Sequence, residues 1–391
     1  MQYRRFGSLD FSVSALGFGA MRLPMKGRAV DEPLAISMIR AAVDRGVNYV
    51  DTAYPYHDGA SEVIVGRALR NGYRQRVKLA TKLPSWLVTT AADFDRFLDL
   101  QLARLQLDSV DFYLLHALNK SSWARVRDLG VIDWAAKAMA KGRFHHLAFS
   151  FHDDAPTFHS IVDAYPWDMC QVQYNFMDAA NGPGTAGVRY AASKGIAVAV
   201  MEPLLGGKLV APPTSVQEIW NGAPRGRSPV AWALDWLWDQ PEVSTVLSGM
   251  STPQQVDENV ELARRSRVGC LTEAERALYP LARARYEGLS LIPCTKCGYC
   301  MPCPHGVDIP ANFGVYNEAI MYNPQASRGQ YAWWKKAFEQ VKTFDHDIRA
   351  VSCQQCGECL EKCPQSIPIS RWMPAIHAAL GENGPLVTGV T

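Results

Sequence analysis

Residues 110–115 have the sequence Val-Asp-Phe-Tyr-Leu-Leu and are followed directly by His116. A short, almost entirely apolar run of this kind is typical of a strand that is buried on both faces of a sheet. Seven further runs precede residue 250, at 15–19, 49–51, 77–81, 145–150, 169–174, 196–201 and 244–248. Eight such strands are the number that closes a (β/α)8 barrel.

The segments between these runs have apolar residues at helical spacing, for example Ala35, Met38, Ile39 and Ala42. Strands that alternate with helices predict parallel βαβ units and therefore an α/β fold. An open doubly wound sheet that binds a dinucleotide would need three glycines after an early strand, and the turn at 17–21 lacks the third. We therefore predict a closed barrel, with residues 2–12 forming a hairpin at its bottom.

Polar residues follow three successive runs, where a barrel places its chemistry. They are Asp51 with Tyr56 five residues later, Lys82, and His116. A buried lysine beside an aspartate can lower the pKa of a tyrosine, which then protonates a carbonyl oxygen while the histidine orients that carbonyl. A single strand-end lysine or histidine is more often structural, but four such residues at three neighbouring strand ends favour a catalytic site.

Eight of the ten cysteines form two runs near the carboxyl end, and Cys170 and Cys270 stand alone as expected core residues. The second run has the spacing of bacterial two-cluster ferredoxins, in which the fourth cysteine ligates the other 4Fe-4S cluster. The first run differs from this spacing, because two residues and not three precede its last cysteine. By this crossing, one cluster takes Cys294, Cys297, Cys300 and Cys363, and the other takes Cys303, Cys353, Cys356 and Cys359.

Two zinc sites are the alternative for these cysteines. Zinc sites pair two separated Cys-x2-Cys doublets and do not need a third closely spaced cysteine, so the pattern favours clusters. A reducing compartment also favours metal ligation over disulfides.

The net charge and the hydropathy of the chain indicate which kinds of partner it can bind. Forty basic and 38 acidic residues leave a formal charge of +2, so nothing indicates a nucleic-acid or anionic-membrane partner. Residues 1–30 contain charges and no apolar signal region, and no run is long enough to span a membrane. We therefore expect a cytoplasmic protein that acts on a small molecule.

Several motifs together resemble the aldo-keto reductase superfamily over residues 2–263. They are Asp51-Thr52-Ala53-Tyr54-Pro55-Tyr56 with Ser61-Glu62, Thr81-Lys82-Leu83, Leu114-Leu115-His116, Gln171-Val172-Gln173-Tyr174-Asn175, and Glu258-Asn259. The resemblance implies that Tyr56 is the proton donor, that Asp51 and Lys82 activate it, and that His116 orients the substrate. The whole chain resembles the subgroup with an appended ferredoxin-like dicluster domain. We expect the barrel in residues 1–286 and an α-helical cluster domain in residues 287–391.

The resemblance also implies a site for NAD(P)H, but several residues that bind this cofactor in the family are replaced in this sequence. The family holds the carboxamide of the nicotinamide with a serine-asparagine pair and a glutamine; Ser150 and Gln171 match, but Phe151 replaces the asparagine. Met201 stands where the family often has an aromatic platform. Met250 and Gln255 replace two cations that bind the 2′-phosphate in NADPH-preferring relatives.

A glycine loop that leads into a helix N-terminus remains, and it suits a phosphate. The expected cofactor residues are Ser150, Gln171, Met201, Pro203, Leu204, Gly206, Ser248, Gly249, Met250, Ser251, Gln255, Glu258 and Asn259. The candidates are NADH, NADPH bound without the usual cations, or flavin mononucleotide (FMN). Iron-sulfur clusters favour the flavin, because a flavin connects two-electron and one-electron chemistry.

The roles of the two parts leave three functions open. The first is an oxidoreductase that reduces a carbonyl or oxidises an alcohol. The second is a flavin-containing barrel that exchanges electrons with an external ferredoxin through the clusters, and the third is a non-enzymatic electron-transfer or redox-sensing module. The clusters are either redox centres or structural metal sites that stabilise a small domain.

Pro212, Pro213 and Pro224 also predict a loop over residues 208–227 at the barrel mouth.

Overall fold

Eight parallel strands form a closed barrel in the computed structural model of the chain, which describes residues 1–27, 29–341 and 344–390. The strand order around the barrel is β10-β11-β12-β3-β6-β7-β8-β9. The strands are β3 (Leu16–Gly19), β6 (Tyr49–Asp51), β7 (Lys78–Leu83), β8 (Val110–Leu118), β9 (Phe144–Phe151), β10 (Met169–Gln173), β11 (Ala197–Met201) and β12 (Val243–Ser248). Each lies on one of the predicted runs, which confirms the predicted barrel.

Two strands extend further than their apolar runs. Lys82 lies within β7, and His116 lies within β8, so both are strand residues and do not follow their strands as predicted. Because a strand places its side chains on alternate faces, this position fixes their direction more firmly than a loop would. Both are still in the carboxyl-terminal half of their strands.

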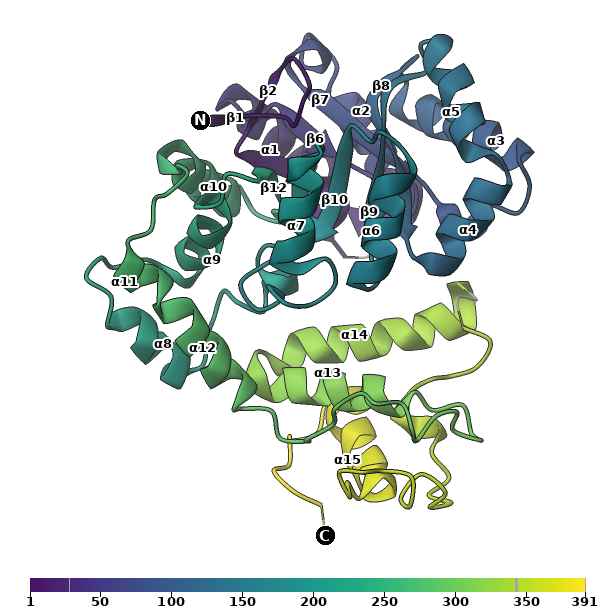
Figure 1. Ribbon diagram of the computed structural model, residues 1–391, viewed down its shortest axis with the longest axis vertical. Coiled ribbons are helices and arrows are strands. Elements are labelled where there is room, and N and C mark those ends of the chain that lie inside the picture. The colour runs from purple at the N-terminus through teal and green to yellow at the C-terminus, as the bar shows by residue number, and fades with distance from the viewer. Residues whose placement is uncertain (28, 342–343, 391) are drawn as a thin grey trace. The chain divides into compact units, whose positions relative to one another are not determined.

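Helices connect the barrel strands, as Figure 1 shows. The helix α1 begins after Asp31, whose side chain accepts a hydrogen bond from the Leu34 amide, and its buried face contains Met38 and Ile39. The barrel helices are α1 (Glu32–Asp44), α2 (Ala60–Ala68), α3 (Ala92–Leu105), α4 (Lys120–Asp128), α5 (Val131–Ala140), α6 (Ala155–Ala164), α7 (Gly184–Ser193), α9 (Pro229–Trp238) and α10 (Pro253–Arg265). No helix in the described part of the chain is long and apolar enough to cross a membrane.

The amino-terminal hairpin closes one end of the barrel interior. Strands β1 (Tyr3–Arg5) and β2 (Ser12–Ser14) pair antiparallel, which confirms the predicted hairpin. Phe6 is fully buried, and its ring centroid lies 5.7 Å from that of Tyr49 and 5.3 Å from that of Phe112. A second small hairpin joins β4 (Met25–Lys26) to β5 (Ala29–Val30). The polar site is therefore at the opposite, carboxyl-terminal end of the strands.

The chain divides into two compact units. The first contains residues 1–206 and 230–273, and the second contains residues 207–229 and 274–391. Residues 208–227 were predicted to be a loop, but they contain the helix α8 (Thr214–Asn221) and belong to the unit that contains the clustered cysteines. The predicted domain boundary between residues 286 and 287 stays a prediction.

The second unit is helical and has its own apolar core. Its helices are α8, α11 (Glu273–Arg276), α12 (Leu278–Glu287), α13 (Ile309–Met321), α14 (Pro324–Lys336) and α15 (Ile369–Gly381). Phe313, Tyr316 and Met373 are among the buried residues of this core, and several clustered cysteines pack against it. Since the loops that carry the cysteines have little regular structure, this helical core is what holds them in place.

Candidate active site and cluster sites

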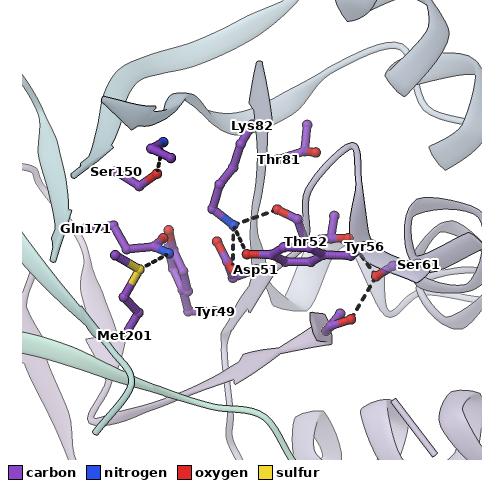
Figure 2. Close-up of polar contacts among 12 residues, drawn as sticks. Tyr49, Asp51, Thr52, Tyr56, Ser61, Thr81, Lys82, Ser150, Gln171 and Met201 are labelled. Carbon is purple, nitrogen blue, oxygen red and sulfur yellow. Dashed lines mark hydrogen bonds and ion pairs between the residues drawn. The ribbon is translucent and has the colours of Figure 1, made fainter. Parts of the chain in front are cut away.

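Lys82 is the centre of a buried polar cluster at the carboxyl ends of β6 and β7 (Figure 2). Its ammonium Nζ donates hydrogen bonds to Asp51 Oδ2 at 2.7 Å, to the carbonyl oxygen of Thr52 at 2.8 Å and to the Tyr56 hydroxyl at 3.3 Å. Lys82 is fully buried, whereas Tyr56 is half-buried. The tyrosine is therefore the member of the cluster that a ligand can reach.

Burial and the Lys82 charge set the protonation states of this cluster. Burial raises the pKa of Tyr56, and this effect outweighs the attraction of the Lys82 ammonium, which lowers it. Burial would lower the pKa of Lys82, but Asp51 and Tyr56 together raise it above its usual value. Burial also raises the pKa of Asp51, while the ammonium at 2.7 Å opposes this and favours the carboxylate. At neutral pH the site thus holds a protonated phenol against a cation.

His116 lies beside Tyr56. Their ring centroids are 6.0 Å apart, and the Trp86 ring is 5.1 Å from His116 on another side. Burial, then the charge of Lys82, then His152, lower the pKa of His116 well below its usual value. Its Nδ1 is buried and has no hydrogen-bond partner among the described residues. A neutral imidazole can still donate one hydrogen bond, which suits it to hold a carbonyl oxygen.

Glu62 on α2 fixes the loop that carries Tyr56. Its fully buried carboxylate accepts hydrogen bonds from Thr81 Oγ1 at 2.7 Å, Gln101 Nε2 at 2.6 Å and Arg104 Nη1 at 3.0 Å. Arg104 Nη1 also donates to the carbonyl oxygen of Tyr54 at 3.2 Å. One carboxylate therefore connects β7 and α3 with the segment just before Tyr56, which gives a physical reason for the Ser61-Glu62 motif.

The residues expected to hold a nicotinamide lie on β9, β10 and β11. Ser150 and Gln171 are directly opposite each other in the register of β9 and β10. Ser150 Oγ accepts a hydrogen bond from the Ala117 amide at 2.8 Å, and Gln171 Nε2 lies 3.6 Å from Met201 Sδ, a weak hydrogen bond to sulfur (Figure 2). Gln171 Oε1 is buried and has no partner among the described residues. This orphaned acceptor fits the N–H donor of an amide-bearing ring.

The residues expected to hold a phosphate lie around the start of α10. Asn259 Nδ2 donates to Ser248 Oγ at 2.9 Å, and the Ser251 amide donates to Gln255 Oε1 at 2.7 Å. The Met250 side chain is fully buried in the core, so only its backbone can face a ligand. Pro203 is buried, Leu204 and Gly206 are half-buried, and Gly249, Ser251, Gln255 and Glu258 are exposed.

Arg22, which belongs to none of the motifs in the sequence, lies across this region. It ends the short 3-10 turn at Ala20–Arg22 that follows β3. A Cβ on Gly249 would lie 3.1 Å from Cβ and Cδ of Arg22, and a Cβ on Gly206 would lie 3.2 Å from Arg22 Nη2. The arginine side chain thus runs from one glycine loop to the other, and a Cβ at either position would make a tight contact with it. In the described part of the chain its guanidinium has no ion-pair or hydrogen-bond partner.

The clustered thiols line two cavities in the second unit. One cavity is lined by Cys294, Cys297, Cys300 and Cys363, and the other by Cys303, Cys353, Cys356 and Cys359, with Cys300 also at its edge. Within the described ranges, no three histidine, cysteine, aspartate or glutamate side chains lie close enough together to hold a single metal ion. None of the ten cysteines, all of which the structure describes, forms a disulfide. Two sets of four thiols around cavities suit two four-iron clusters, and the exchange of the fourth cysteines between them stays a prediction.

A parallel barrel with a protonated tyrosine beside a buried lysine, and a second unit with two sets of four thiols, define a barrel oxidoreductase with iron-sulfur clusters. The chain belongs to the aldo/keto reductase family, whose family model matches residues 15–267. The model of a 4Fe-4S dicluster domain matches residues 293–367. Both matches confirm the family resemblance and the fold class predicted from the sequence.

Three known proteins illustrate the similarity. L-galactose dehydrogenase from Arabidopsis thaliana is 27% identical over 281 residues, which cover 66% of this chain and 87% of that protein. Aflatoxin B1 aldehyde reductase member 4 from Homo sapiens is 41% identical over 108 residues, which cover 27% of this chain and 32% of that protein. The holo form of an aldo-keto reductase from Bacillus halodurans superposes with a TM-score of 0.61 at 25% identity, over 72% of this chain and 96% of that one.

Proposed function

We propose that this protein reduces a small carbonyl compound, or oxidises the corresponding alcohol, with Tyr56 as the proton donor. The observation that carries the proposal is the Lys82 ammonium, which contacts both Asp51 at 2.7 Å and the Tyr56 hydroxyl at 3.3 Å. The names of two similar proteins, an L-galactose dehydrogenase and an aflatoxin B1 aldehyde reductase, support the same substrate class.

The protein's own residues handle the proton. The pKa of Tyr56 is raised by burial, so the phenol holds its proton until a carbonyl oxygen that gains negative charge accepts it. Lys82 then balances the charge of the phenolate, and Asp51 keeps the ammonium in place. Neutral His116 donates a hydrogen bond that holds the carbonyl oxygen near the tyrosine hydroxyl.

A nicotinamide cofactor would supply or accept the hydride when bound. Ser150 and Gln171 would hold its carboxamide, because the free Gln171 Oε1 accepts from an amide N–H and the Ser150 hydroxyl still has a hydrogen to donate. Phe151 and Met201 would give this ring apolar contacts where relatives have an amide and an aromatic ring.

Arg22 would bind the cofactor phosphate. Its guanidinium lies beside Gly206 in the loop that follows β11, while its aliphatic part passes Gly249 in the loop that follows β12. A guanidinium forms charge-assisted, bidentate hydrogen bonds with phosphate oxygens. It would therefore replace the two cations that are missing at Met250 and Gln255. The backbone around Ser251 at the start of α10 would complete the phosphate site.

FMN is the second candidate for this cofactor. Met201 offers no aromatic platform for a nicotinamide ring. The flavin ring also has an N–H group, from which Gln171 Oε1 can accept a hydrogen bond. The single phosphate of FMN would need only Arg22 and the glycine loops. The thiol-lined cavities favour it further, because 4Fe-4S clusters exchange single electrons and a flavin can pass electrons one at a time. In that case an external ferredoxin would be the electron partner.

Anaerobic purification followed by acid release of the bound cofactor distinguishes the candidates. A colourless supernatant, with consumption of NADPH or NADH when 4-nitrobenzaldehyde is added to the protein, is the expected result. A stoichiometric yellow flavin in the supernatant contradicts the nicotinamide proposal and establishes the second candidate. A protein that holds its iron but neither releases flavin nor oxidises either nicotinamide would be a non-enzymatic electron carrier or sensor.

A further inference from the structure

A cavity of about 190 Å³ that several polar side chains line opens at the carboxyl ends of β9 and β10. Phe151 and His152 line it from β9 and the residue after it, Gln173 lines it from the end of β10, and Asp178 and Asn181 line it from the loop that follows. The proposed proton transfer uses none of these residues.

The carboxylate of Asp178 organises this cavity. Its Oδ2 accepts hydrogen bonds from Gln173 Nε2 at 2.9 Å and from Asn175 Nδ2 at 3.0 Å, and its Oδ1 accepts a longer one from Asn181 Nδ2 at 3.4 Å. These bonds orient the side chains of Gln173 and Asn181 before any ligand arrives. The amide oxygens Gln173 Oε1 and Asn181 Oδ1 have no partner among the residues that the structure describes, so both are available to accept hydrogen bonds.

His152 connects the cavity to the catalytic cluster. Its backbone amide donates a hydrogen bond at 3.0 Å to the carbonyl oxygen of Leu118, on the strand β8 that also carries His116. His152 is exposed, and partial desolvation lowers its pKa, so its imidazole is neutral at neutral pH and open to a ligand. Its ring makes no hydrogen bond to any described residue. It therefore offers one donor and one acceptor to a ligand that reaches from the catalytic site into the cavity.

The charge of the cavity limits what it can bind. Its lining contains two carboxylates, Asp153 and Asp178, and no lysine or arginine in the described ranges. Both carboxylates are already occupied, because Asp153 accepts from the amides of Lys120 at 2.8 Å and Asp154 at 2.9 Å. An anionic ligand would be repelled there, and the groups that remain free are neutral acceptors and an imidazole.

We propose that this cavity binds the neutral, hydroxyl-rich part of the substrate, so that the preferred substrate is a polyhydroxylated aldehyde or ketone without a charged group. A hydroxyl group is both donor and acceptor, and it matches Gln173 Oε1, Asn181 Oδ1 and the His152 ring. A site with polar groups in fixed positions rejects an analogue that lacks hydroxyls, because those groups then lose their water without gaining a partner. This inference rests on the proposed carbonyl chemistry at Tyr56.

The test compares two aldehydes of five carbons, D-xylose and pentanal, with the anaerobic full-length protein and its cofactor. The variants are Asn181→Ala and His152→Leu, and Gln75→Ala is a control at an exposed position away from the cavity. Each variant is compared with the wild type on the same substrate, so the open-chain fraction of xylose cancels. Loss of one neutral hydrogen bond predicts that kcat/KM falls about threefold to tenfold more for D-xylose than for pentanal.

Equal effects on both aldehydes, or no effect on either, contradict the inference. If the wild type reduces none of D-xylose, pentanal and 4-nitrobenzaldehyde, the proposed function fails, and binding of xylitol measured by calorimetry then tests the cavity alone. The inference predicts that the wild type and Gln75→Ala bind xylitol equally, and that Asn181→Ala binds it about threefold to tenfold more weakly. Absence of xylitol binding, or binding of D-gluconate as tight as that of xylitol, overturns it.

Discussion

Tyr56 keeps its proton because burial raises its pKa more than the Lys82 ammonium lowers it. The sequence predicts the partners of this tyrosine but assigns the lysine the larger effect. The balance between a nearby charge and desolvation depends on how deeply the site is buried, and residue order does not give that depth. A phenol that keeps its proton at neutral pH can donate that proton to a carbonyl oxygen as the oxygen gains negative charge.

The pH dependence of carbonyl reduction follows from these residues. Because the pKa of His116 is lowered well below 6.5, its imidazole is neutral throughout the neutral range. Because the pKa of Tyr56 is raised from 10.0, its proton is lost only at higher pH. We expect kcat/KM to show no inflection near pH 6.5 and to fall only as pH rises above about 10. A profile with an inflection between about pH 6 and 7 that disappears in His116→Gln would show that His116 titrates in this range.

Arg22 gives a prediction that concerns the cofactor alone. Arg22→Ala removes a charge-assisted contact to phosphate, so the Kd for NADPH is expected to rise about tenfold to hundredfold. Fluorescence titration measures this Kd, and Arg22→Lys should recover part of the loss. Arg5→Ala, at an exposed position in the amino-terminal hairpin, is the control. If Arg22→Ala and Arg5→Ala bind NADPH as the wild type does, Arg22 does not contact the phosphate.

At the scale of elements, the barrel strands were predictable because a strand buried on both faces needs a continuous apolar run. Arg22 was not predictable from its own neighbourhood, since the direction of a long flexible side chain is set by packing. A signal did exist: in a closed barrel the first strand lies beside the last, so residues after β3 approach Gly249 after β12. The helix α8 was missed because the prolines around it outweighed eight residues with helical spacing.

The Glu62 contacts predict how firmly the Tyr56 loop is held. Removing one partner of a buried ion pair leaves the other charge uncompensated, so Glu62→Ala is expected to lower the free energy of unfolding by about 3 kcal/mol. Urea denaturation followed by tryptophan fluorescence measures it. Glu32→Ala removes a partner from the half-exposed Arg67–Glu32 pair and should cost less than about 1 kcal/mol. Equal costs for the two variants would show that the Glu62 network does not hold the loop.

At the scale of the whole molecule, the sequence predicts both parts of the chain but not how they share it. Residues 207–229 lie between two barrel strands in sequence, yet they belong to the unit with the cysteines. Lys208 forms an ion pair of 2.7 Å with Glu318 on α13 within that unit. Charges far apart in sequence leave no periodic pattern, so this pairing could not be inferred from the residues alone.

The grouping of the thiols predicts which ligands belong together. Cys363 lines the cavity of Cys294, Cys297 and Cys300, although it is the last cysteine of the other run. Cys363→Ala should therefore lose one cluster and lower the iron content from about eight to about four per chain. Iron analysis of the anaerobic protein measures this, with Cys270→Ala as the control that keeps all the iron. Unchanged iron in Cys363→Ala, or stoichiometric zinc in the wild type, contradicts the assignment.

The most direct measurement for the proposed function is the single-turnover rate of NADPH oxidation by 4-nitrobenzaldehyde in the wild type and in Tyr56→Phe. Phenylalanine keeps the ring and removes only the hydroxyl that lies 3.3 Å from Lys82 Nζ. We predict a fall in this rate of about 10²-fold to 10⁴-fold, as expected for loss of a general acid, with unchanged iron content and unchanged Kd for NADPH. A Tyr56→Phe rate equal to that of the wild type would contradict the account.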